Sequence, residues 1–167
     1  LTNANLRWAD LSSAYLGYST LTNANLTGAN LAGAQMEYST LTNANLSGAA
    51  VTRAYLSYAT GFTREQLYST MDYQAKNLQG IQLNGNDLSG WDFSGQDLTE
   101  ASFAYATLTN ARFDGAIVTG ASLVANPTGF TREQLYSTAN YKLKNLQRIR
   151  LSGSSISGWD FSGQDLS

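Results

Sequence analysis

The amino-acid sequence predicts an all-β fold, a four-sided β-solenoid whose short coils stack along one axis. Three observations predict it: a large apolar residue recurs every five positions, a small residue stands two places before it, and whole segments recur 20 positions apart. Five is the period of neither a helix nor a strand, but it fits a chain that turns a corner every five residues. We expect one solenoid domain over residues 1–167.

Two inward-facing slots in each repeat explain the period of five. The larger slot holds mostly Leu from Leu1 to Leu56, with Met36 and Val51 as exceptions, and the smaller slot holds Ala or Ser. Further blocks with the same spacing cover 78–123 and 146–166. Four walls converge on a narrow axis, so a small side chain is required beside each large one. The other three residues of each repeat are expected to face solvent.

The number of sides follows from the longer period. The hexamer LTNANL occurs at 1–6, 21–26 and 41–46, so identical segments are four pentapeptides apart. A coil of 20 residues places these copies directly above one another, as solenoid repeats require. The same register predicts a column of Tyr18, Tyr38 and Tyr58. Counting sides along the chain predicts about eight coils.

Two insertions interrupt the pentapeptides, near 61–75 and 129–143, and both contain the segment GFTREQLYST. Thr63 followed three residues later by Gln66 is a capping-box pattern, so a short helix is expected to begin there and to end near Thr70. The second copy repeats this pattern. Trp91 and Trp159 occupy the small inward slot in the coils that follow, and we expect those coils to be wider.

The pattern A-[DN]-L-x-x, seen at 9–11, 24–26 and 29–31, resembles the pentapeptide-repeat family. This resemblance implies a right-handed quadrilateral β-helix and a tendency to dimerise, so end-to-end self-association is expected. The segment GFTREQLYST is similar to insertions in large bacterial pentapeptide-repeat proteins that are thought to be exported. That similarity favours an exported or extracellular setting over a cytoplasmic one.

Composition argues against catalysis and against several classes of partner. The chain has no His and no Cys, so no cofactor or metal site is expected. The net charge of −2 gives no reason to expect nucleic acid, and no apolar run has the length of a membrane span. Asp92 with Asp97, and Asp160 with Asp165, are pairs that could act as acid and base. The repeat instead places Asp or Asn in this outward slot to bond the turn backbone, so we predict a structural role and no enzyme.

The sequence therefore predicts a non-enzymatic scaffold for protein or surface binding, with an unknown protein as a possible partner. Large aromatic and arginine side chains dominate interface energetics, and irregular segments on a rigid scaffold often bind. The candidate binding residues lie on the insertions and in the tyrosine column: Arg64, Tyr68, Arg132, Tyr136, Tyr18, Tyr38 and Tyr58.

Three alternative functions remain open at this point. A DNA mimic that binds a topoisomerase needs rows of outward carboxylates, whereas the exposed slots here carry mostly Thr, Asn, Ser, Tyr and Gly. Regular Thr pairs such as Thr20 and Thr22 resemble ice-binding surfaces, although Thr also suits any β-wall. An aromatic strip on a rigid wall could also bind carbohydrate.

The predicted register can be tested with a pair of neighbouring substitutions. Leu26→Asp places a charge on the axis without a partner and should destabilise the protein by roughly 4 kcal/mol or more. Thr27→Asp changes an outward position and should leave the melting temperature nearly unchanged. Thermal unfolding followed by circular dichroism measures both, and equal melting temperatures for the two variants would show that the register is wrong.

Overall fold

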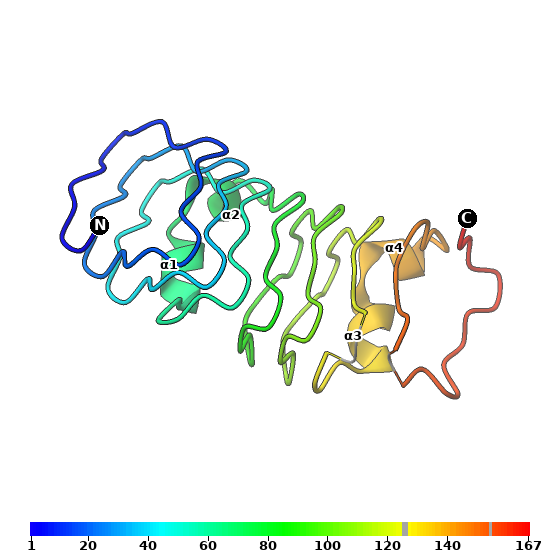
Figure 1. The fold of residues 1–167 in the computed structure, drawn as a ribbon. Coiled ribbons are helices and arrows are strands. Elements are labelled where there is room, and N and C mark those ends of the chain that lie inside the picture. Colours follow the sequence, from blue (N-terminus) through cyan, green and yellow to red (C-terminus); the bar gives the residue numbers. More distant parts are fainter. Residues whose placement is uncertain (125–126, 154) are drawn as a thin grey trace. The chain divides into compact units, whose positions relative to one another are not determined.

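The structure of the chain, a computed structural model, describes residues 1–124, 127–153 and 155–167. The chain divides into two compact units, Leu1–Gln82 and Leu83–Ser167, and each is described by itself (Figure 1). Both units consist of stacked coils with a pair of short helices at the side of the coils. None of the helices in the described part of the chain has the length and apolar character needed to cross a bilayer.

In the first unit, parallel bridges join residues that are 20 positions apart, such as Asn5 with Asn25 and Asn25 with Asn45. The Leu6 N–H donates to the Asn25 carbonyl at 2.8 Å, and the Asn25 N–H donates back to the Ala4 carbonyl at 2.9 Å. The bridges recur every five residues, so each coil of 20 residues has four sides. The predicted register is confirmed.

A tight turn closes each side. In the first one, the Ala4 N–H donates to the Leu1 carbonyl at 3.0 Å, and Asn3 has a φ of 58°. A type II turn requires this positive φ at its third residue, a conformation that Gly and Asn adopt most easily. The corner residues stack from coil to coil in four columns: Asn3, Asn23 and Asn43; Trp8, Gly28 and Gly48; Ser13, Gly33 and Arg53; Tyr18, Tyr38 and Tyr58.

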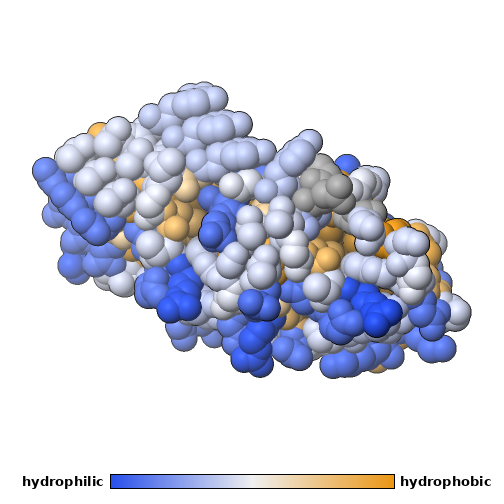
Figure 2. All heavy atoms as spheres, turned by 90° about the horizontal axis from the view of Figure 1, so that it is seen from below, coloured by the Kyte–Doolittle hydropathy of each residue, from blue (hydrophilic) through white to orange (hydrophobic). Residues whose placement is uncertain are grey.

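The two inward slots form the core of this unit. Leu21, Leu26 and Leu31 are completely inaccessible to solvent, and so are the small residues Ala29 and Ala34. Burying a Leu side chain contributes about 1.5–3 kcal/mol, so this regular core supplies most of the driving force for stacking. On the face seen in Figure 2, hydrophobic atoms show mainly in gaps between hydrophilic and intermediate ones.

The first insertion contains two short helices, α1 (Arg64–Tyr68) and α2 (Met71–Gln74). The capping box that the sequence predicted is present, with Thr63 and Gln66 each accepting from the other's backbone N–H. The sequence prediction missed α2. It begins because Thr70 has two roles: its hydroxyl donates to the Leu67 carbonyl at 2.7 Å and caps α2 by accepting from the Tyr73 N–H.

The helices replace part of the wall of their coil. The Gln66 side-chain amide donates to the carbonyls of Leu41 and Ala44, at 2.7 and 2.8 Å, and Leu67 fills the core with no exposed surface. The coil is longer as a result, because Tyr55 bridges to Gln82, 27 positions further on, where regular coils have 20.

The second unit repeats this arrangement with α3 (Arg132–Ser137) and α4 (Ala139–Lys142). Its core is more aromatic, because Phe93, Phe103 and Phe113 contact one another with ring centroids 5.4–5.8 Å apart. Trp91 occupies a small inward slot, as predicted, with only 6% of its surface exposed. Its ring packs beside Phe93 with centroids 6.3 Å apart, so the aromatic cluster fills the space around the large side chain.

A single carboxylate ties α2 to the coil above it, and this contact can be tested. One oxygen of buried Asp72 accepts from the Val51 N–H at 2.6 Å, the Thr52 N–H at 2.7 Å and the Thr52 hydroxyl at 2.6 Å. Asn140 holds the same place in the second unit, where its side-chain oxygen accepts from the Val118 N–H at 2.7 Å.

We therefore expect Asp72→Asn to change the free energy of unfolding by less than about 1 kcal/mol, because an acceptor is kept. Asp72→Ala leaves two backbone N–H groups without a partner and should cost about 1–3 kcal/mol. Urea unfolding of the two variants measures the difference. An alanine variant as stable as the wild type would mean that the helix pair does not depend on this contact.

Candidate binding surface on the tyrosine wall

The column of Tyr18, Tyr38 and Tyr58 that the sequence predicted is present in the first unit. Adjacent rings stack with centroids 5.0 Å apart and interplanar angles of 9° and 3°. The exposed fractions are 72% for Tyr18, 48% for Tyr38 and 37% for Tyr58, so a continuous aromatic strip faces solvent. We call the strip and the residues beside it, Tyr15 and Tyr55, the tyrosine wall.

The backbone at this column is strained. Tyr18, Tyr38 and Tyr58 have φ values of 59°, 57° and 55°, in the left-handed region that bulky residues rarely adopt. The left-handed conformation costs roughly 1–2 kcal/mol for each residue with a β-carbon, whereas an aromatic pair contributes about 0.5–1.5 kcal/mol beyond its buried area. When the cost of three strained residues is set against the contribution of two stacked pairs, the column adds little or no net stability to the fold. The other corner columns of this unit contain mostly Gly or Asn, which fit the turn with less strain.

A groove of about 210 Å³ lies beside the column, between Tyr15 and the rings of Tyr18 and Tyr38. It is lined by Tyr15, Gly17, Tyr18, Gln35, Glu37 and Tyr38. Gln35 and Glu37 are not among the site residues predicted from the sequence. The 20-residue register contained the signal, since it places Gln35 below Tyr15 and Glu37 below Gly17.

The predicted site residues of the first insertion do not join this surface. α1 lies beneath residues 41–48, whereas the column belongs to the wall of residues 16–20, 36–40 and 56–60. Arg64 forms an ion pair with Glu65, with Nε and Oε1 2.6 Å apart. The ring of Tyr68 is half-buried and stacks on Tyr73 with centroids 4.3 Å apart.

In the second unit the corresponding residues also contact their own chain. Arg132 pairs with Glu133 at 2.7 Å, and the Tyr136 ring stacks on Tyr141 with centroids 4.1 Å apart. The Tyr136 hydroxyl accepts from the Asp160 N–H, and the Tyr141 hydroxyl donates to the Asp160 carbonyl at 2.7 Å. Partial burial and the neighbouring Tyr136 raise the pKa of Tyr141 to about 12. The two rings hold the next coil in place.

The paired carboxylates have the structural role that the sequence predicted. Asp92 and Asp97 accept from the backbone N–H groups two residues later, at 2.8 and 3.0 Å. Asp160 and Asp165 do the same, at 2.8 and 3.0 Å. Asn25, Asn30 and Asn45 form equivalent bonds in the first unit, so the slot requires an acceptor and not a charge.

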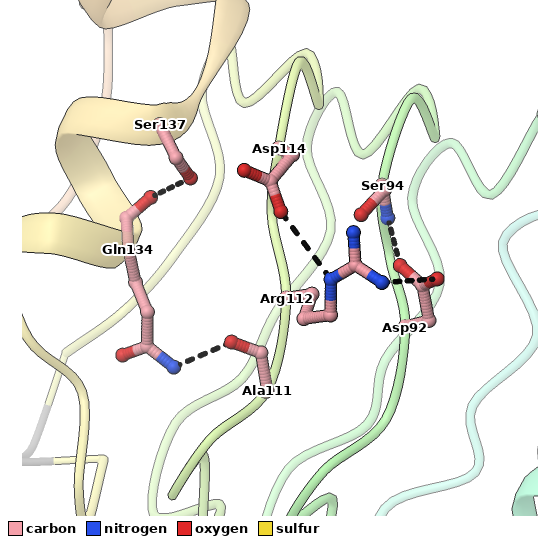
Figure 3. Close-up of polar contacts among 7 residues, drawn as sticks. All are labelled: Asp92, Ser94, Ala111, Arg112, Asp114, Gln134 and Ser137. Carbon is pink, nitrogen blue, oxygen red and sulfur yellow. Dashed lines mark hydrogen bonds and ion pairs between the residues drawn. The ribbon is translucent and has the colours of Figure 1, made fainter.

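The carboxylates also do not form the rows that a DNA mimic needs. Asp87, Asp92 and Asp97 lie on successive sides of a coil, and their bridge partners in the next coil are Thr107, Arg112 and Ile117. Arg112 lies between two carboxylates, with its nitrogens 3.6 Å from Asp92 and 3.4 Å from Asp114 (Figure 3). On each of these three sides, the carboxylate is therefore followed along the axis by a residue without negative charge.

Coils of four five-residue sides, with inward Leu or Phe and small residues, define a quadrilateral β-helix built from pentapeptides. The chain belongs to the pentapeptide-repeat family, whose sequence profile matches eight repeat copies over residues 4–37, 19–57 and 77–115. Among curated proteins, none matches the chain by sequence.

Solved structures of pentapeptide-repeat proteins resemble the chain at low sequence identity. HetL, involved in heterocyst differentiation regulation in the cyanobacterium Nostoc sp. strain PCC 7120, is 25% identical over 92% of this chain and 66% of its own, with a TM-score of 0.31. A thylakoid-lumen protein from Arabidopsis thaliana is 20% identical over 80% of this chain and 70% of its own, with a TM-score of 0.26. Full-length QnrB1, a plasmid-mediated fluoroquinolone resistance protein, is 18% identical over 100% of this chain and 91% of its own, with a TM-score of 0.37. Family membership rests on the repeat match.

The turn role of the carboxylates predicts a pH dependence. Hydrogen bonds from the Ser89 hydroxyl and then from its backbone N–H lower the pKa of Asp87 in the folded protein. A lowered folded-state pKa adds stability above the unfolded value of about 3.9, and this stability is lost as the pH falls through the folded pKa.

Asp87→Asn keeps the acceptor but cannot titrate, so the wild type should lose stability relative to this variant only below about pH 4. Urea unfolding at pH 7, 5 and 3 measures the difference. A stability difference that stays constant over this range would contradict the hydrogen bonds from Ser89 to the Asp87 carboxylate.

Proposed function

We propose that this chain is a non-enzymatic repeat scaffold of about eight coils whose tyrosine wall binds a protein or a cell-surface partner. The observation that carries the proposal is a column of exposed, stacked tyrosines on strained backbone. Strain that packing does not repay points to a role beyond folding. An exposed aromatic strip also supplies the contact area that dominates interface energetics.

The contacts of the insertions support this choice of surface. Arg64 and Arg132 are each paired with the adjacent Glu, and the Tyr136 hydroxyl is bonded to the coil that follows. These contacts use part of the hydrogen-bonding capacity of each side chain, so a partner that binds there competes with existing bonds. The tyrosines of the column have no such competing bonds to polar groups of the described residues.

The chemistry of the described residues supports a binding role over catalysis. The paired carboxylates Asp92 and Asp97 are used as turn acceptors. The walls carry short polar side chains in ladders, such as Asn23 donating to Asn3 at 3.1 Å and Asn43 donating to Asn23 at 3.3 Å. A rigid wall of this kind presents side chains at a fixed spacing, which suits a partner with a regular surface. An exported setting, which the insertion sequence favours, fits a partner at a cell surface.

The proposal is tested by removing the three column rings together. In the variant Tyr18→Asn, Tyr38→Asn, Tyr58→Asn, the loss of stacking is offset by relief of the left-handed strain. We expect the free energy of unfolding to change by less than about 2 kcal/mol. The matched control is Asn3→Gly, Asn23→Gly, Asn43→Gly, which alters a corner column on another wall and keeps the turns.

Binding is measured with fluorescently labelled chain on an array of purified glycans and on an array of purified bacterial surface proteins. The wild type and the glycine control should bind the same features, and the tyrosine variant should lose them. If the tyrosine variant unfolds several kcal/mol more easily and retains its binding, the column has a structural role and the proposal is wrong.

A further inference from the structure

The groove beside the tyrosine column exists because one side chain is missing from a regular wall. Gly17 occupies the slot that Glu37 holds one coil further on. The Tyr15 ring leans toward this gap: a β-carbon at Gly17 would lie 3.6 Å from the ring carbon Cζ and 3.7 Å from the hydroxyl oxygen. The gap opens into the hollow of about 210 Å³ between Tyr15, Tyr18 and Tyr38.

Two polar side chains without partners complete the lining. Gln35 and Glu37 line the groove, and in the described part of the chain no hydrogen bond or ion pair engages either side chain. A glutamine amide both donates and accepts, and a carboxylate accepts. Aromatic walls with a few convergent polar groups are the usual composition of a small-molecule site.

We propose that this groove binds one pyranose ring of a β-linked polysaccharide; the proposal rests on the proposed function, because the groove is part of the tyrosine wall. A pyranose has an apolar C–H face that packs on an aromatic ring such as Tyr15. Its equatorial hydroxyls both donate and accept, which matches Gln35 and Glu37. The hollow is smaller than the roughly 300–1,000 Å³ of drug-sized pockets, so it fits a single ring.

The geometry favours a sugar over an alkylammonium cation, the other ligand that tyrosines and a carboxylate attract. Cation binding needs open ring faces. Tyr18 and Tyr38 are parallel within 9° with centroids 5.0 Å apart, so their facing surfaces cover each other and are closed to a cation. A β-1,4-linked chain such as cellohexaose or chitohexaose is extended and flat, so it can continue from the groove along the wall.

The test uses soluble cellohexaose and chitohexaose, with α-linked maltohexaose for comparison, titrated into the whole chain by isothermal titration calorimetry. We expect saturable binding of at least one β-linked hexasaccharide and none of maltohexaose. Gly17→Glu places in the hollow the side chain that the next coil carries in the same slot, so the fold tolerates it. Affinity should fall roughly tenfold or more, because the ring can no longer enter.

The matched control is Ser12→Glu, which adds the same charge in the equivalent slot of the neighbouring wall and should bind like the wild type. Gln35→Ala should weaken binding without lowering the melting temperature. Binding that survives Gly17→Glu, or that prefers maltohexaose, would overturn the proposal. If neither β-linked sugar binds while the tyrosine column still captures a purified protein on the array, the sugar assignment is wrong and the scaffold function stands.

Discussion

The backbone register between coils is the constraint on which the rest of this structure depends. In each side, N–H groups bond either to the neighbouring coil or across the turn, as Leu6 does to Asn25 and Ala4 does to Leu1. A shift by one residue would move Leu26 from the axis into solvent and break every bond of its side at once. The chain must therefore keep 20 residues per coil, or compensate for each departure locally.

The two insertions show how a departure is compensated. A wall made of helix offers few backbone partners to the next coil, those of Ser69 and Met71 among them. Side chains supply others: Gln66 donates to two carbonyls and Asp72 accepts from two N–H groups. In the second unit Gln134 donates to the carbonyls of Leu108 and Ala111, the latter drawn in Figure 3, and Asn140 accepts from the Val118 N–H. Irregular segments on a rigid scaffold often bind partners. In this chain the polar side chains of the insertions form hydrogen bonds to the neighbouring coils of the scaffold.

Because of the same register, one residue type that recurs at a given position of each coil forms a continuous column on the surface. A side chain in one corner is repeated every 20 residues, so Asn becomes a hydrogen-bonded ladder and Tyr becomes a stack. Corner backbone favours Gly and Asn, and the tyrosine column is the one corner column of the first unit that consists wholly of bulky residues. A gap in one column, such as Gly17 beside the Tyr15 ring, becomes a groove because the neighbouring slots are filled.

The sequence by itself determined the five-residue side, the four-sided coil, the column of Tyr18, Tyr38 and Tyr58, and the capping boxes at Thr63 and Thr131. These features repeat at fixed spacing or depend on residues within one turn, so no distant contact is needed to specify them. Only the tertiary structure decided that each insertion forms two helices, that Asp72 bonds to the coil above, and that Gln35 and Glu37 line a groove. Those features depend on which side chains and backbone groups meet across coils once stacking has occurred, and in the insertions the regular spacing that predicts such meetings is lost.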